Sequence, residues 1–118
     1  MLLNKYLLTL LIAMSFNVLS SEKEVNDEWC KSNNGKIEFT TKDRTFVDCL
    51  TQKYAVEAEY DYNWKEAIGQ SLHYSETTGK KAAILFIKRE QSKKDYLNEL
   101  NRVIKKFDLP IKVFITQE

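Results

Sequence analysis

The sequence contains few of the residues that mark unusual protein classes. Its 118 residues include only 3 Gly, 1 Pro, 2 Cys and 1 His. So little Gly and Pro excludes collagen-like and low-complexity chains, and two cysteines cannot form the dense framework of a disulfide-rich domain. Glycine-rich nucleotide loops, serine-hydrolase elbows and zinc-ligand spacings are also missing. With 43% hydrophobic and 30% charged residues, the composition predicts one compact globular domain.

An excess of charge of one sign is missing too. The chain has 18 basic and 17 acidic residues, for a formal net charge of +1. Residues 1–20 hold one base, Lys5, and no acid, so that residues 21–118 carry 17 of each sign. A neutral total charge argues against strong, sequence-independent attraction to a polyanion.

Residues 1–20 have the pattern of a secretory signal. Lys5 precedes an apolar run from Tyr6 to Phe16, and Val18 and Ser20 fit the small-residue rule for cleavage after Ser20. The apolar run is shorter than the roughly 20 residues that span a bilayer, which disfavours the alternative of an uncleaved anchor. We therefore predict a signal peptide at 1–20 and an exported domain at 21–118, periplasmic or secreted, with no stable membrane span after cleavage.

Cys30 and Cys49 are the two cysteines of the predicted exported domain. In an oxidising compartment two cysteines usually pair, and a bridge that closes a loop of this length stabilises a fold by roughly 3 kcal/mol. We predict this disulfide; the alternative is two buried free thiols.

The periodicity of apolar residues predicts an α/β domain with a mixed sheet and the order αβββαβαβ. Strands are expected at 36–41, 44–51, 54–60, 81–88 and 111–116, and the first three should form an antiparallel meander. Helices are expected at 21–32, at 64–77 behind a capping box of Asn63 and Glu66, and from Ser92, with an apolar stripe from Tyr96 to Phe107. The unbroken run AAILFI predicts a strand buried on both faces.

Three carboxylates are expected on two neighbouring strands. Glu57 and Glu59 are two residues apart and so point to one face of their strand, and Asp48 lies on the strand before it. Oxygen ligands of this kind suit Mg²⁺ or Mn²⁺, so Asp48, Glu57 and Glu59 are the predicted metal ligands. The alternative is a set of solvated acids on an exposed strand face.

The run VDCLTQKYAVEAEYDYNWKEAIGQSLHYSETTGKKAAILFI resembles small exported proteins of the PD-(D/E)XK nuclease superfamily, and the match covers residues 36–118. The resemblance implies a restriction endonuclease-like core and Mg²⁺-dependent hydrolysis of phosphodiester bonds in DNA or RNA. It implies Asp48 and Glu57 as catalytic metal ligands. It also points to Gln70 and Tyr74, which match a Q-x-x-x-Y element on the helix that follows.

Position 59 departs from the superfamily pattern, which places Lys where this chain has Glu59. Glu59 would then act as a second metal ligand or a general base, or Lys65 on the next helix would replace the missing lysine. The alternative for Lys65 is a solvated residue of the first helical turn. The alternative for the whole chain is a catalytically inactive, nuclease-fold periplasmic protein that binds a protein partner.

Overall fold

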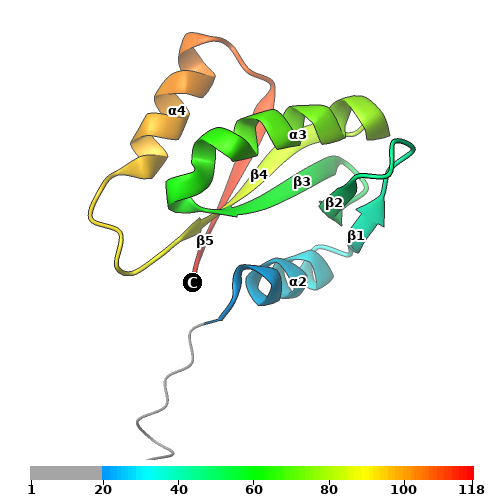
Figure 1. The fold of residues 1–118 in the computed structure, drawn as a ribbon, viewed down its shortest axis with the longest axis horizontal. Coiled ribbons are helices and arrows are strands. Elements are labelled where there is room, and N and C mark those ends of the chain that lie inside the picture. Colours follow the sequence, from blue (N-terminus) through cyan, green and yellow to red (C-terminus); the bar gives the residue numbers. More distant parts are fainter. Residues whose placement is uncertain (1–19) are drawn as a thin grey trace, which may run out of the picture.

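The computed structural model describes residues 20–118, so the predicted signal peptide lies almost entirely outside the described residues. The described chain is an α/β domain with a five-stranded mixed sheet and three α-helices (Figure 1). The elements in chain order are α2 (Glu22–Ser32), β1 (Lys36–Thr40), β2 (Phe46–Leu50), β3 (Tyr54–Tyr60), the 3-10 helix η1 (Asp61–Asn63), α3 (Trp64–Thr78), β4 (Lys81–Lys88), α4 (Tyr96–Lys106) and β5 (Ile111–Gln117). The predicted α/β class and mixed sheet are confirmed.

The strands lie in the sheet in chain order, β1-β2-β3-β4-β5. The first two pairings are antiparallel, as predicted for a meander, and the pairings of β3 with β4 and of β4 with β5 are parallel. Parallel neighbours need a crossover connection, and α3 and α4 provide it. In Figure 1 these two helices lie on one side of the sheet and α2 on the other.

Strand β4 carries the run AAILFI because both of its faces are buried. Ala83, Leu85 and Ile87 pack in a cluster with Val25 and Cys30 of α2. The alternate residues, Ala82, Ile84 and Phe86, pack against Trp64 and Ala67 of α3 and Leu100 of α4. Alternation along a strand sends successive side chains to opposite faces, and because both faces of β4 are covered by helices, residues 82–87 are all apolar.

A disulfide between Cys30 and Cys49 joins α2 to β2, and these are the two cysteines that the sequence predicts to pair. Gly35, between α2 and β1, passes directly over the bridge. A Cβ atom at this position would lie 2.6 Å from Cys30 Sγ and nearer still to Cys49 Sγ. Only glycine fits here without moving the chain.

Helix α3 starts at Trp64 as predicted, but its predicted capping box does not form, and the predicted start of α4 is wrong. Asn63 makes no capping hydrogen bond to α3, because η1 precedes the helix and Asn63 Nδ2 donates instead to Glu59 Oε1 at 3.2 Å. Helix α4 starts at Tyr96 rather than Ser92, and the carboxylate of Asp95 caps it by accepting from Asn98 N at 3.0 Å.

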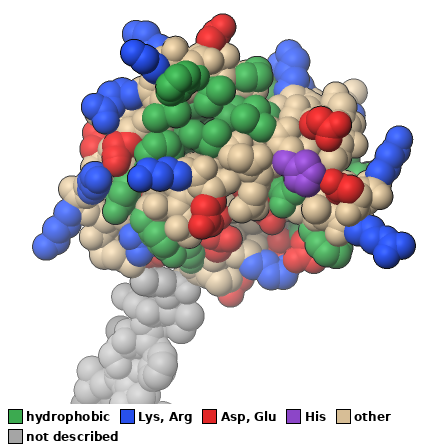
Figure 2. All heavy atoms as spheres, turned by 45° about the horizontal axis from the view of Figure 1, so that its top comes forward, with side chains coloured by type: hydrophobic (Ala, Val, Ile, Leu, Met, Phe, Trp, Pro, Cys, Tyr) green, Lys and Arg blue, Asp and Glu red, His purple; other side chains and the backbone are tan. Residues whose placement is uncertain are grey.

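The predicted apolar stripe of α4 also ends too late. Phe107 follows the last helical residue and is 68% exposed, so it is not part of the core. Figure 2 shows hydrophobic side chains gathered on the face of the molecule that carries α3 and α4. Ile68 and Leu72 of α3 and Ile104 of α4 are only partly buried there.

Candidate functional site

Strands β2 and β3 separate after a short pairing, and Asp48 lies in the opening. The two strands pair only through Cys49 with Val56 and Leu50 with Ala55. Beyond these pairs the Asp48 carboxylate takes the place of a strand partner, since its Oδ2 accepts from Ala58 N at 2.9 Å. A side chain of β2 therefore bridges to the backbone of β3.

A bend in β1 puts Asp48 in this position. Glu38 has a φ of 51°, which interrupts the regular alternation of side chains. On one side of the bend the paired residues Ile37 and Cys49 belong to the α2 face of the sheet. On the other side the paired residues Phe39 and Val47 belong to the cluster that includes Tyr74 of α3. Asp48 lies at the change of face.

Glu57, which is buried, and Asp48, which is partly buried, form a pair of carboxyl groups joined by a side-chain hydrogen bond. Burial, and then the charge of Asp48, raise the pKa of Glu57 far above its ordinary value. Burial also raises the pKa of Asp48. Glu57 therefore keeps its proton at neutral pH and donates it to Asp48. Glu57 is only 4% exposed, and its Oε2 has no hydrogen-bond partner among the described residues.

Glu59 is the next acid along the same face of β3. Burial and a side-chain hydrogen bond with Glu22 raise the pKa of Glu59 to about 7. The hydrogen bond from Asn63 acts in the opposite direction and is outweighed. Glu22 also accepts from Tyr60 N at 3.4 Å, so the start of α2 is fastened to the end of β3 through these acids.

Helix α3 contributes Gln70 and Tyr74 to the same region. Burial raises the pKa of Tyr74 to about 12, and the nearby charges of Glu57 and Asp48 add to the effect. The Tyr74 hydroxyl donates to Gln70 Oε1 at 3.4 Å. The structure thus brings Asp48, Glu57, Tyr74 and Gln70 into one neighbourhood, although they were predicted from separate elements.

Lys65 is not part of this neighbourhood. Its side chain is exposed, and its Nζ lies 5.6 Å from the centre of the Trp64 ring. Within residues 20–118 the structure gives Lys65 no ion pair with a carboxylate.

Two polar residues of α2 belong to the site without having been predicted. Asn26 Nδ2 donates to Asp48 O at 3.0 Å, and Asn26 Oδ1 is buried without a partner among the described residues. Asn26, Glu22 and Asp48 line a small hollow of about 130 Å³. A sequence signal existed, because Glu22, Asn26 and Cys30 are spaced by four residues and Cys30 was expected to face β2.

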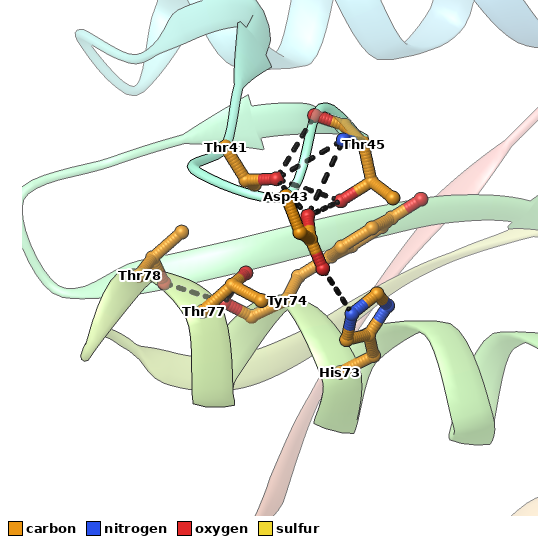
Figure 3. A network of polar contacts seen from close by, with 7 residues as sticks. All are labelled: Thr41, Asp43, Thr45, His73, Tyr74, Thr77 and Thr78. Atoms are coloured by element: carbon orange, nitrogen blue, oxygen red, sulfur yellow. Dashed lines mark hydrogen bonds and ion pairs between the residues drawn. The ribbon is translucent and has the colours of Figure 1, made fainter.

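A second polar network fastens the β1–β2 loop to α3 (Figure 3). Asp43 Oδ1 accepts from the backbone and hydroxyl of Thr45 and from the Thr41 hydroxyl, while Asp43 Oδ2 lies 2.7 Å from His73 Nε2. These hydrogen bonds, first those of Thr41 and Thr45, hold the pKa of Asp43 well below its usual range. The sole histidine therefore connects the β1–β2 loop to α3. The sequence signal for this loop was Asp43, which has a threonine two residues away on each side, because Asp and Thr side chains commonly form hydrogen bonds within turns.

The predicted metal ligands do not form a recognisable metal centre. Among residues 20–118 no three His, Cys, Asp or Glu side chains are arranged to hold a metal ion. Among the described residues, the unsatisfied Glu57 Oε2 next to Asp48 is a feature that fits a bound cation. A Mg²⁺ or Mn²⁺ ligand role for Asp48, Glu57 and Glu59 stays a prediction.

Lysines gather at the end of the sheet where β3, β4 and β5 begin. We call Lys53, Lys80, Lys81 and Lys112 the lysine edge. Lys81 is in register with Tyr54, the residue after Lys53, and Lys112 is in register with Ala83. Lys80 Nζ is held by Gln52 O at 2.8 Å. Three of the four line an open hollow of about 620 Å³, together with uncharged residues and no acid.

Comparison with known proteins gave three curated relatives, all KilA-N domain-containing proteins of Acanthamoeba polyphaga mimivirus. One is 34% identical over 103 residues, which is 87% of this chain and 28% of that protein. Another is 32% identical over 111 residues, 94% of this chain and 44% of that protein. The third is 34% identical over 90 residues, 76% of this chain and 24% of that protein. The chain thus spans less than half the length of these relatives. No family model matches the chain, and no solved structure gives a significant match.

These relatives overturn the resemblance to the PD-(D/E)XK nuclease superfamily. The short motifs that suggested it occur in a chain whose similar proteins are KilA-N domain-containing proteins. The expected activity, that of an exported magnesium-dependent nuclease, was therefore wrong, and so was the description as a hydrolase. The mixed sheet is established, but nothing identifies it as a restriction endonuclease-like core.

Two predictions concern the surroundings of the protein. No helix within residues 20–118 is long and apolar enough to cross a bilayer. Export was inferred from residues 1–20 and stays a prediction, because that segment lies outside the described part of the chain.

Proposed function

We propose that this domain binds nucleic acid through the lysine edge. The observation that carries the proposal is the separation of charge: the whole chain has a formal charge of only +1, yet four lysines lie together where three strands begin. The hollow beside them is lined by no acid. A cluster of lysines on one face is the electrostatic footprint of a surface that contacts phosphates.

Neutral total charge does not oppose this proposal, because several of the acids lie in or beside the core. Glu57 and Glu59 are buried and Asp48 is partly buried, and Glu57 holds its proton at neutral pH. They therefore contribute little negative potential at the lysine edge. The similarity to viral KilA-N domain-containing proteins supports nucleic acid as the partner.

The test is the salt dependence of binding to labelled DNA and RNA, duplex and single-stranded, measured by fluorescence anisotropy. Lys53 and Lys81 are exposed, so replacing both by Gln removes two phosphate contacts without disturbing the core. Each phosphate contact contributes about 0.7 to 0.9 to the slope of log K against log salt concentration. The double variant should bind more weakly than the parent, and its slope should fall by about 1.4 to 1.8.

The matched control is the pair Lys88→Gln and Lys93→Gln. Lys81 and Lys88 are the first and last residues of β4, and Lys93 lines one hollow together with Lys88, so the control removes the same charge near the opposite end of β4. It should leave the slope unchanged. Equal losses in the two double variants would show a general charge effect and contradict binding at the lysine edge, as would absence of binding by the parent chain.

We also propose a second function, the binding of a divalent cation at the Asp48–Glu57 pair. Its support is Glu57 Oε2, a buried carboxyl oxygen that has no hydrogen-bond partner within residues 20–118. Carboxylate oxygens are the ligands that hard divalent cations prefer. The cation would replace the proton that the two groups share and would supply positive charge in the opening between β2 and β3.

A further inference from the structure

The two edges of the sheet are built differently. Strand β1 is five residues long, begins with Lys36 and is interrupted at Glu38 by the φ of 51°. Short length, charge and a local bend are the usual means by which an edge strand avoids pairing with other chains. The edge formed by β1 is therefore protected.

Strand β5 lacks these features. It is seven residues long, pairs only with β4 within the described residues, and carries a single charge, that of Lys112. Pro110 precedes the strand and does not interrupt it. Among the described residues, the backbone N–H and C=O groups on its outer side have no strand partner, and the segment from Val113 to Gln117 has no charge.

Apolar surface accompanies this open edge. Ile111 and Val113 pack in the cluster beneath α3 and α4. Ile115 points to the same face, because side chains two residues apart on a strand do so, but it is 55% exposed. The apolar row of β5 thus continues past the part of the sheet that the helices cover.

We propose that β5 pairs antiparallel with β5 of a second copy of this chain, centred on Phe114. In that register Val113 of one copy lies opposite Ile115 of the other, so that each exposed Ile115 gains an apolar neighbour. Lys112 lies opposite Thr116, and therefore no like charges meet. The two sheets become one continuous ten-stranded sheet, with α2 of both copies on the same side.

The occupant is a second copy because the strand is complementary to itself. Its only charge meets an uncharged residue, and its apolar row meets the same row of the partner. Slipping the pairing by one residue would bring side chains of opposite faces against each other. A slip that brought Lys112 opposite Lys112 would place like charges in direct contact, which destabilises strand pairs.

The register gives a charge-reversal test at Thr116. Thr116→Lys places a lysine opposite Lys112 twice in each dimer, and Thr116→Glu places a glutamate there twice. Sedimentation equilibrium of the purified full chain should show a reversible dimer. Two cross-strand pairs change the dimer dissociation constant by about 2- to 30-fold, so Thr116→Lys should raise it and Thr116→Glu should lower it by factors in this range.

Rescue ties the effect to the predicted neighbour. Adding Lys112→Glu to Thr116→Lys restores opposite charges and should return the dissociation constant to that of the parent or below. Thermal melting at low protein concentration shows that each variant is folded. A chain that is monomeric at all concentrations would overturn the proposal, and so would equal effects of Lys and Glu at position 116 or a failure of rescue.

Discussion

Replacing Glu59 by Gln should make the protein more stable at pH 8 but not at pH 5. Glu59 is buried beside Glu22, and these surroundings raise its pKa to about 7 from an ordinary value of 4.5. Glutamine has no charge to bury, and its carbonyl oxygen can still accept the hydrogen bond that Asn63 now gives to Glu59 Oε1.

The size of the effect follows from the pKa. Because the folded protein holds the Glu59 proton more tightly than the unfolded chain does, the contribution of Glu59 to stability is fully present below about pH 4.5 and is lost as the pH rises through 7. The difference between a pKa of about 7 and the ordinary 4.5 corresponds to a loss of about 3 kcal/mol in the free energy of unfolding once the pH is above 8. The Glu22 carboxylate shares in the interaction, so we expect the variant to gain about 1 to 3 kcal/mol at pH 8 and less than about 0.5 kcal/mol at pH 5.

Urea unfolding at the two pH values, with a chelator present to keep cations away from the neighbouring carboxyl pair, measures this difference directly. Glu66→Gln is the matched control, because Glu66 is exposed on the first turn of α3. The control should show no gain that depends on pH. An equal gain for Glu59→Gln at both pH values, or a loss at pH 8, would refute the account of Glu59 as a buried acid whose ionisation opposes folding.

Two further predictions concern the core and the carboxyl pair. Leu100→Ala should lower the free energy of unfolding by about 2 to 5 kcal/mol, because Leu100 is fully buried between α4 and the sheet; a loss below about 1 kcal/mol in urea unfolding would contradict that packing. If the Asp48–Glu57 pair binds a cation, Mg²⁺ or Mn²⁺ should raise the melting temperature of the parent chain but not of Asp48→Asn, and more at pH 8 than at pH 6 because Glu57 must lose its proton. No rise at either pH would rule the cation site out.

The sequence alone was sufficient for most of the local structure. The bounds of β3 and β4 are those predicted, because alternation and an unbroken apolar run depend only on neighbouring residues and on burial. The pairing of Cys30 with Cys49 followed from their number. The helix caps were less predictable, because η1 precedes α3 and Asn63 donates to Glu59 instead of capping the helix.

The short motifs that resembled a nuclease superfamily were misleading about function. Each motif covers a few residues, whereas the relatives found by comparison are similar over 76% to 94% of the whole chain. Asp48, Glu57, Gln70 and Tyr74 do lie together, but their proximity does not by itself define a reaction.

Only the tertiary structure decided where charge lies. The sum of charges is almost zero, and it concealed a lysine edge assembled from strand starts that are far apart in sequence, at Lys53, Lys80–Lys81 and Lys112. Asp48 lies against Glu57 because β1 bends at Glu38 and because β2 separates from β3, and neither feature is visible in the sequence. Periodicity is a local property that a sequence carries openly, but register, bends and the order of strands depend on all the elements packing together, and these determine which distant side chains meet.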